Sequence, residues 1–565
     1  MTASRLIATL ALAACTSAPA PEPAPAPAPA TPAAEQAASD TTTRQAAAAR
    51  DTTAATPAPP PAPVRQAPPH SIVPAPVSAT FNLTDAFTVD TLTTTVTVDS
   101  GATPEVRRLS RLVARMIERD TAPAMRRLRR GQQPDTNTIY LRIDSTIAGG
   151  DEAYTVAVTR ERVTLAARTH EGLFRAVQTL RQLFPYQVEH PDLLGRRLRL
   201  PGVRIEDAPR FTWRGSMVDV SRHFLAVEDV KRHIDLMALY KLNRLHLHLS
   251  DDQGWRLEIR KHPRLTRIGA RTQVGRQPPV AGGFYTQAQF RDLVRYARER
   301  YVMIIPEFDM PGHTNAALAS IPSLNCDRKS PPPYTGIKVG FSAVCAEREA
   351  TYRWVNDVVR EVAAISPSPY IHLGGDEVEK IPHPQYIKFV ERIEKIVQRH
   401  GKRMIGWGEI APAKLDTTTI VQLWRGSGRD STAMHAARGG KVLMSPGPKM
   451  YIDMKHDTSM ALGLRWAGLV TLRTAYDWDP ATYQPGVTEA SIVGVEAPLW
   501  SETLVKYADF EFMAFPRLLA VAEVGWTPQA LRDWEDFRLR LVPQGQRLQA
   551  LGVNFHRSPQ VDWVP

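Results

Sequence analysis

The feature that most constrains the fold is a regular alternation, from Phe211 onward, of short β-rich runs with amphipathic segments of helical period. Such alternation is typical of repeated βα units, whose strands pair in parallel because each helix returns the chain to the same end of the sheet. Eight units within roughly 320 residues favour a closed (β/α)8 barrel over an open sheet. The eight runs are residues 215–220, 244–249, 302–306, 370–373, 403–406, 419–423, 441–444 and 491–495.

Helical segments with recognisable ends separate these runs. In residues 286–300, Thr286 and Gln289 have the spacing of a capping box, and residues 383–400 are followed by Gly401, a common helix stop. Two later segments, residues 510–522 and 533–551, are expected to complete the outer ring of helices. The sequence therefore predicts a catalytic (β/α)8 barrel, or TIM barrel, over residues 201–565.

Two segments of different composition precede the barrel. Residues 79–200 mix alternating stretches with helical segments at 105–120 and 172–183, which predicts a small α/β domain. Residues 16–78 consist mostly of Ala, Pro, Thr and Gln without apolar periodicity. Because such a segment cannot bury enough apolar surface to fold, we expect an extended, disordered tether.

Residues 1–15 resemble a bacterial lipoprotein signal. Arg5 precedes a short apolar stretch that ends in Leu12-Ala13-Ala14-Cys15. This stretch is too short to span a bilayer, so we expect an export signal that is removed, with Cys15 lipidated. The protein would then be periplasmic or at the cell surface, held to the membrane by the lipid anchor alone. The alternative is a plain secretory signal in which the Cys is incidental.

Composition excludes some other classes. The formal charge is +12, but the Arg residues are scattered through helical segments, so we read them as a solvated surface and expect no nucleic-acid partner. Cys326 and Cys345 are the only other cysteines. Export makes a disulfide between them chemically possible, and two free buried thiols are the alternative. A metal site needs more ligands than this pair supplies, so no metal is predicted.

Polar and aromatic residues follow every run, where a barrel of this kind has its active site. Carboxylates, Trp rings, an Arg and His residues at one mouth suggest a sugar pocket, because apolar sugar faces stack on indole rings and hydroxyls need polar partners. In chain order these residues are Asp219, Arg222, His223, Asp251, Asp252, Glu307, Asp309, His313, Asp376, Glu377, Trp407, Glu409, Trp424, Tyr451, Asp453, Glu496, Trp500 and Glu502.

The adjacent pair Asp376-Glu377, preceded by two glycines, is the most informative of these features. Two carboxyl groups in one pocket disfavour double ionisation, so that one pKa is raised, which suits a general acid. We expect Glu377 to protonate the glycosidic oxygen and Asp376 to stay charged. Asp219 and Glu307 could instead face the barrel interior, satisfied by neighbouring groups.

Five motifs occur in order along the whole barrel: residues 219–224 (DVSRHF), 245–255 (LHLHLSDDQGW), 306–313 (PEFDMPGH), 372–377 (HLGGDE) and 496–502 (EAPLWSE). Together they resemble glycoside hydrolase family 20, the β-N-acetylhexosaminidases. The segment 151–184 is similar to the family's non-catalytic α/β domain. One departure is Gly408, where many relatives carry an acidic residue.

The resemblance implies retaining hydrolysis of terminal N-acetylglucosamine or N-acetylgalactosamine without an enzyme nucleophile and without a cofactor. The substrate's acetamide oxygen would attack its own anomeric carbon and form an oxazolinium ion. Glu377 would be the acid and then the base, and Asp376 and Tyr451 would hold the acetamide.

By the same resemblance, His313 and either Asp251 or Asp252 would tune Glu377 from behind, and Cys326 and Cys345 would form a loop disulfide. The substrate-binding residues would be Arg222, Asp252, Trp407, Trp424, Asp453, Trp500 and Glu502. The expected partners are oligosaccharides that contain N-acetylhexosamine.

Three alternative functions are considered. A non-catalytic glycan-binding barrel predicts the loss of Asp376, Glu377 or Tyr451, and all three are present. A chitinase-type enzyme predicts spaced aspartates before its Glu, whereas His372 and two glycines precede Asp376 here. A disaccharide-releasing family member needs a roomier pocket than three Trp residues indicate.

Overall fold

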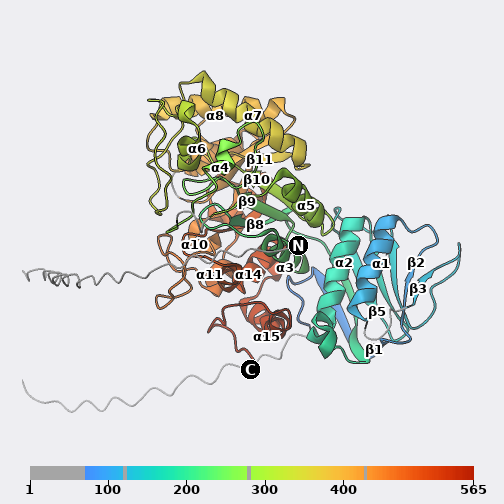
Figure 1. Cartoon of the computed structure of the whole chain (residues 1–565). Helices are drawn as coiled ribbons and strands as arrows, with labels where there is room; N and C mark the ends of the chain where they lie inside the picture. The colour runs from blue at the N-terminus through green and yellow to red at the C-terminus, as the bar shows by residue number, and fades with distance from the viewer. Residues whose placement is uncertain (1–69, 119–123, 277–281, 426–428, 565) are drawn as a thin grey trace, which may run out of the picture. The chain divides into compact units, whose positions relative to one another are not determined.

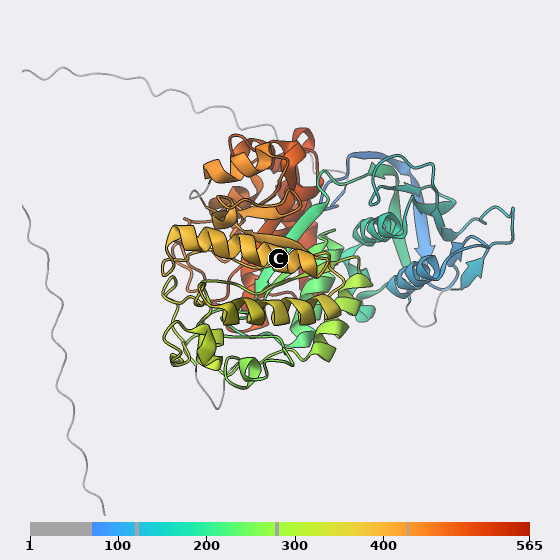
Figure 2. The same ribbon diagram turned by 90° about the horizontal axis from the view of Figure 1, so that it is seen from above.

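The computed structural model describes residues 70–118, 124–276, 282–425 and 429–564, which form a seven-stranded sheet followed by a closed eight-stranded barrel (Figures 1 and 2). The expected signal, with Cys15, and the expected tether up to residue 69 lie outside the described residues. Within the described ranges, no helix combines the length and apolar character needed to cross a bilayer.

The N-terminal domain is a mixed sheet. Strands β1, β7, β5 and β6 pair antiparallel, and β6, β4, β2 and β3 continue the sheet in parallel. Helices α1 (Pro104–Met116) and α2 (His170–Leu183) lie side by side against it (Figure 1). The predicted small α/β domain is therefore confirmed. The strands are β1 (Ser78–Asp90), β2 (Thr95–Val98), β3 (Met125–Arg127), β4 (Thr138–Ile143), β5 (Tyr154–Val158), β6 (Arg162–Ala167) and β7 (Arg197–Asp207).

Both expected boundaries of this domain differ from those in the structure. The tether was expected to continue to residue 78, but Ile72 and Val73 are fully buried. The amide of Val73 donates to Gln182 Oε1 at 2.8 Å, which holds the segment against α2. Strand β7 continues past residue 200 to Asp207, because its second half pairs with β5.

The second domain is the predicted barrel, and all eight runs are its strands. The strands pair in parallel throughout, and β9 next to β10 closes the circle. Most strand ends lie within one or two residues of the predicted ones, but the last strand runs on to Leu499. The strands are β8 (Trp213–Asp219), β9 (Arg244–His248), β10 (Met303–Glu307), β11 (Tyr370–His372), β12 (Arg403–Trp407), β13 (Ile420–Leu423), β14 (Lys441–Met444) and β15 (Ile492–Leu499).

Helices surround the barrel and mostly begin and end where the sequence indicates. Thr286 and Gln289 form the predicted capping box, and Gly401 ends α8 with φ +70°, a conformation that favours glycine. The expected helix 510–522 is two helices, because Pro516 lacks the N–H that a continuous helix would need. The main outer helices are α3 (Val227–Leu239), α5 (Gln287–Arg298), α7 (Glu349–Ile365), α8 (His383–Arg399), α9 (Arg429–Ala437), α13 (Tyr507–Ala514), α14 (Arg517–Trp526) and α15 (Trp534–Ala550).

Two further features fix the frame. Cys326 and Cys345 form the disulfide that the family resemblance implied, with their Cα atoms 5.0 Å apart.

Glu152, from the N-terminal domain, lies between two buried guanidinium groups: it is 2.7 Å from Arg175 of α2 and also pairs with Arg214 of β8. The two domains therefore meet through a buried ion cluster.

Candidate active site

Closure of the barrel brings the residues after the strands to one end, where glycines permit a tight turn after β11. Gly374 and Gly375 have φ values of +66° and +103°, and Glu377 also has a positive φ of 50°. A Cβ atom on Gly374 would lie 1.7 Å from Asp309 Oδ1, so no other residue fits there. This turn sets the two adjacent carboxyl groups, Asp376 and Glu377, in the mouth of the barrel.

His313 lies between these two carboxyl groups. Its Nε2 atom is 3.5 Å from Glu377 Oε2 and 3.7 Å from Asp376 Oδ2, and its Nδ1 atom is 3.1 Å from Asp251 Oδ1. Burial would lower the pKa of His313, but the charges of Asp251 and Asp376 outweigh it and raise that pKa well above 6.5. His313 is therefore an imidazolium facing the carboxyl pair.

The pKa values of the two carboxyl groups are shifted in opposite directions. Burial, together with the charge of Glu377, raises the pKa of Asp376. Burial would also raise the pKa of Glu377, but His313 and Arg425 outweigh it and lower that pKa. The sequence predicted one raised pKa and a charged Asp376, with Glu377 as the acid. In the structure the raised pKa belongs to Asp376, because that side chain is deeper and Glu377 faces two cations.

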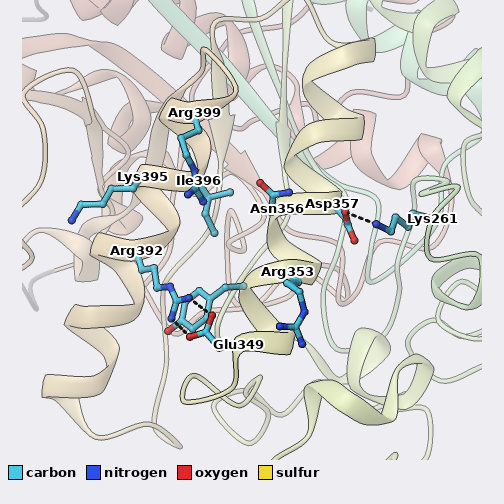
Figure 3. Close-up of a pocket in the computed structure, with 10 residues that line it drawn as sticks. Lys261, Glu349, Arg353, Asn356, Asp357, Arg392, Lys395, Ile396 and Arg399 are labelled. Carbon is cyan, nitrogen blue, oxygen red and sulfur yellow. Dashed lines mark hydrogen bonds and ion pairs between the residues drawn. The ribbon is translucent and has the colours of Figure 1, made fainter.

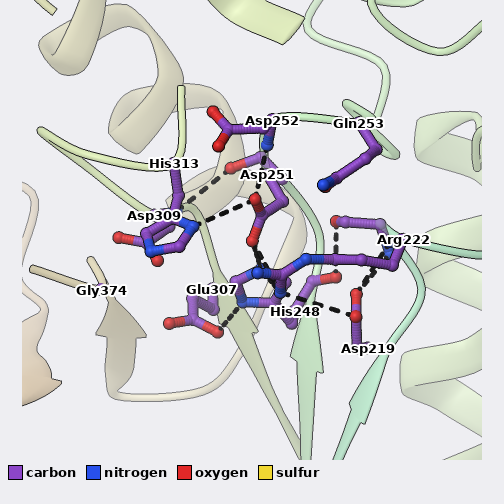
Figure 4. Close-up of polar contacts among 12 residues, drawn as sticks. Asp219, Arg222, His248, Asp251, Asp252, Gln253, Glu307, Asp309, His313 and Gly374 are labelled. Carbon is purple, nitrogen blue, oxygen red and sulfur yellow. Dashed lines mark hydrogen bonds and ion pairs between the residues drawn. The ribbon is translucent and has the colours of Figure 1, made fainter. Parts of the chain in front are cut away.

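A chain of buried hydrogen bonds continues behind His313 (Figure 4). The second oxygen of Asp251, Oδ2, is 2.7 Å from His248 Nε2 and 2.7 Å from Arg222. His248 bonds through its other ring nitrogen to Glu307. Asp251 therefore links Arg222, on one side of the mouth, to His313 on the other, and it is the carboxylate that partners His313.

Asp252, the other candidate for that role, is engaged elsewhere. Its Oδ1 atom accepts from the amide of Asn315 at 2.9 Å and from the hydroxyl of Ser342. Ser342 belongs to the loop closed by the disulfide. Asp252 therefore holds this loop through one oxygen, while its Oδ2 atom is buried without a hydrogen-bond partner among the described residues. That Asp252 binds substrate stays a prediction.

The sequence left open whether Glu307 lines the pocket or faces the barrel interior. In the structure it lies in the interior. It lies at ion-pair distance from two imidazoles, 3.0 Å from His246 Nε2 and 2.9 Å from His372 Nδ1. It also accepts the indole N–H of Trp407 at 2.9 Å. Asp219 likewise accepts from backbone amides, including that of Ser501 at 3.1 Å. Both carboxylates support the pocket from below and do not line it.

Groups of His and carboxylate side chains in this region are close enough to hold a cation. One such group is His246, Glu307 and His372. However, both ring nitrogens of His246 already lie within 3.0 Å of a carboxylate oxygen, from Glu307 and Glu496. This group is therefore a set of ion pairs beneath the site.

Four aromatic side chains form one wall of the mouth, as the resemblance implied. The ring centre of Trp407 lies 6.3 Å from that of Trp424 and 5.8 Å from that of Trp500. The ring centre of Tyr451 lies 5.9 Å from that of Trp424 and 6.4 Å from that of Trp500. All four are buried. The four rings therefore pack into one aromatic cluster at the end of the barrel, and the indole N–H of Trp407 is bonded to Glu307.

The other wall is polar and incompletely paired. Both carboxyl oxygens of Asp453, and Oδ1 of Asp376, are buried without a hydrogen-bond partner among the residues that the structure describes. Burial and the neighbouring Glu502 raise the pKa of Asp453 well above its usual range. Arg222 lies 4.8 Å over the Trp500 ring. Buried polar atoms without partners are rare, and here they indicate a polar ligand.

Sequence reasoning did not single out two residues of the mouth. Trp466 is 53% exposed and packs edge-on at 5.6 Å from Trp424 and 5.3 Å from Tyr451. Arg425 lies 3.3 Å from Glu377 Oε1. Trp466 lies in a long loop after β14, well beyond the end of that strand, and Arg425 is one of many Arg residues. Neither position therefore has a local sequence pattern that would mark it as part of the site.

Comparisons with known proteins agree with this arrangement. The family model "Glycosyl hydrolase family 20, catalytic domain" matches residues 211–385 and 380–529, and that of "domain 2" matches residues 69–208. A β-N-acetylhexosaminidase of Cellulomonas fimi is 41% identical over 88% of this chain and 98% of its own length.

Solved structures give the same result. The GH20 β-N-acetylhexosaminidase of Streptomyces coelicolor A3(2) is 42% identical, with a TM-score of 0.83 over 88% of this chain and 100% of its own. A mutant β-hexosaminidase of Streptomyces plicatus, solved with its product GlcNAc, is also 42% identical, with a TM-score of 0.81 over 89% of this chain and 99% of its own.

Proposed function

Since the chain belongs to glycosyl hydrolase family 20 and is a β-N-acetylhexosaminidase, a glycoside hydrolase, we propose that it releases single terminal sugars and that the substrate's own acetamide is the nucleophile. The substrates are oligosaccharides ending in β-linked N-acetylglucosamine or N-acetylgalactosamine.

The closed aromatic wall supports exo action. Trp407, Trp424, Tyr451 and Trp500 form a buried aromatic cluster at the end of the barrel, and such a wall suits stacking against one sugar and its acetamide. The Streptomyces plicatus relative is solved with a single sugar, GlcNAc, as its product. A disaccharide-releasing enzyme is the second candidate, and it would need this wall to open.

The single observation that carries the acetamide mechanism is the position of Asp376. This carboxyl group lies deep in the mouth with one oxygen unpaired, while Glu377 lies further out, with side-chain exposures of 8% and 22%. Asp376 can accept the acetamide N–H and stabilise the positive charge that develops on the ring of the oxazolinium ion. The Tyr451 hydroxyl would donate to the acetamide oxygen and aim it at the anomeric carbon.

Glu377 acts on the other side of that carbon. In the first step the acetamide oxygen forms a bond to the anomeric carbon, the glycosidic bond breaks, and Glu377 gives its proton to the leaving oxygen. In the second step Glu377 takes a proton from water, which opens the oxazolinium ion with net retention. Arg222, Asp453 and Glu502 would hold the sugar hydroxyls during both steps.

The test is hydrolysis of p-nitrophenyl N-acetyl-β-glucosaminide beside p-nitrophenyl β-glucoside, which lacks the acetamide. We expect rapid release of p-nitrophenol from the first compound only. Cleavage of both would contradict the acetamide mechanism. Cleavage of neither would favour the disaccharide-releasing or the binding-only alternative.

We also propose that the protein is exported and carried on the outside of a bacterial membrane by a lipid on Cys15. The support is the signal-like sequence around Leu12-Ala13-Ala14-Cys15 and a disulfide, which suits an oxidising compartment. Radioactive palmitate should label the wild-type protein, and Cys15→Ser should abolish the label. A label that persists in this variant would contradict the anchor.

A further inference from the structure

Arg425 follows Trp424 after strand β13, at the outer edge of the active site. Side-chain exposure rises from 8% for Asp376 to 22% for Glu377 and 39% for Arg425. These three side chains are linked by His313 and by the ion pair between Glu377 and Arg425. The series therefore runs from the floor of the pocket to solvent, with Arg425 outermost.

The Arg425 guanidinium contacts two carboxyl groups and an aromatic face. One terminal nitrogen lies 3.3 Å from Glu377 Oε1 and the other lies 3.2 Å from Glu409 Oε1. The guanidinium carbon lies 4.4 Å from the centre of the Trp424 ring. Glu409 in turn accepts the indole N–H of Trp424 at 2.9 Å. The side chain is therefore held at the rim by several contacts while part of it stays open to solvent.

We propose that Arg425 selects substrates whose leaving group carries a carboxylate, so that the preferred substrates are N-acetyl-β-hexosaminides of acidic sugars. This inference rests on the proposed function, in which Glu377 protonates the leaving oxygen. A group that touches Glu377 on its solvent side must lie beside the leaving group. A guanidinium presents paired N–H donors in the geometry that a carboxylate accepts.

The existing partners of Arg425 can yield to such a ligand. Ion pairs with partly exposed partners are weak, typically about 0–1 kcal/mol, so exchanging one carboxylate for another costs little. Burial and the charge of Asp376 raise the pKa of Glu409 to about 7, so Glu409 is only partly charged at neutral pH. Of these two carboxyl groups, Glu377 therefore competes more strongly with an incoming carboxylate than Glu409 does.

This exchange would also help the acid. Arg425 is one of the charges that lower the pKa of Glu377, together with His313 and Arg222. When the substrate carboxylate pairs with Arg425, the pKa of Glu377 rises, so that Glu377 carries the proton it must donate in a larger fraction of molecules. An acidic leaving group would thus be both recognised and activated.

The experiment compares two aryl substrates of the same shape, 3-carboxyphenyl and 3-carbamoylphenyl N-acetyl-β-glucosaminide, at pH 7 and low salt. The value of kcat/KM for each is measured with wild type, Arg425→Gln and Arg425→Lys. The control is Arg353→Gln, which removes one positive charge from α7. Arg353 lies in a groove between α7 and α8, and none of the residues that line this groove belongs to the active site (Figure 3).

We expect the acid-to-amide ratio of kcat/KM to fall about tenfold in Arg425→Gln, the size of one charge-assisted hydrogen bond. Arg425→Lys should recover part of the ratio, and Arg353→Gln should keep it. An unchanged ratio with both rates lowered equally would overturn the proposal and leave Arg425 acting only on Glu377. If wild type cleaves neither compound, the proposed function itself fails, which is a separate outcome.

Discussion

At the scale of single residues, the chemistry depends on two neighbouring carboxyl groups in different surroundings. Asp376 is buried and has an unpaired oxygen, whereas Glu377 faces His313 and Arg425. Adjacent residues can differ in this way because the glycine turn before them points one side chain inward and the other toward the rim. Two predictions separate their roles.

The first prediction concerns Glu377→Gln. Because the amide cannot donate a proton to the leaving oxygen, turnover of chitobiose should fall by about 10²–10⁴-fold, while p-nitrophenyl N-acetyl-β-glucosaminide, which needs less help, should lose less. Steady-state kinetics on both substrates measures this difference. Glu379→Gln is the control, since Glu379 is exposed and close in sequence. Near wild-type turnover of chitobiose by Glu377→Gln would refute the assignment.

The second prediction concerns Asp376→Asn. This change disturbs the acetamide and not the leaving group, so the activated and the poor substrate should lose a similar factor, about 10²-fold or more. The ratio of the two losses, measured in the same assay, distinguishes Asp376 from Glu377. Full activity of this variant on the p-nitrophenyl substrate would remove Asp376 from the mechanism.

At the scale of elements, the site depends on helices that hold the barrel strands in register. Helix α3 packs against β8 through His233, whose Nε2 atom is 3.0 Å from the hydroxyl of Ser216. The other ring nitrogen of His233 lies 3.3 Å from the hydroxyl of Tyr507 on α13. One buried imidazole therefore joins a strand and two helices.

A third prediction follows for the pH dependence of stability. Burial lowers the pKa of His233 to about 4, so the folded protein keeps it neutral while the unfolded chain binds a proton below about pH 6.5. Stability should therefore fall as pH drops from about 6.5 toward 4, at about 1.4 kcal/mol per pH unit for this group.

Urea unfolding at pH 7 and pH 5 measures this effect. In His233→Gln, which cannot titrate, the drop in unfolding free energy between the two pH values should be smaller by about 2 kcal/mol. If wild type and variant lose the same free energy on acidification, His233 does not carry the effect.

At the scale of the whole molecule, the N-terminal domain and the barrel are joined by buried charges. Glu152 pairs with Arg175 and Arg214, and it also accepts from Asn243 at 3.2 Å. Burial would raise the pKa of Glu152, but the two guanidinium groups outweigh it and lower the pKa to about 2. The carboxylate is therefore charged over the whole physiological range.

The fourth prediction is that Glu152→Gln lowers the free energy of unfolding by about 3–5 kcal/mol, because the buried Arg214 loses its counter-ion and the buried Arg175 keeps only its ion pair with Glu171. Glu161→Gln is the matched control: Glu161 pairs with Arg162 on the surface, with 63% of its side chain exposed, so its loss should be about 0–1 kcal/mol. Urea unfolding measures both. Equal losses in the two variants would show that the cluster adds nothing to stability.

Local pattern was enough for much of the fold. The eight runs and the capped helices could be predicted because strand and helix periods repeat within a few residues. The end of the tether was predicted wrongly, because Ile72 and Val73 are buried by α2 and not by a pattern of their own. The break at Pro516 did not follow from proline chemistry alone, because α15 continues through Pro543.

By itself, the sequence determined the barrel, the order of its motifs and the set of side chains at its mouth, since position after a strand is a local property. Only the tertiary structure decided that Asp251 and not Asp252 meets His313, that the raised pKa belongs to Asp376, and that Arg425 touches Glu377. These outcomes depend on burial and on distances between residues far apart in the chain, and neither is encoded in the spacing of residues along one strand or helix.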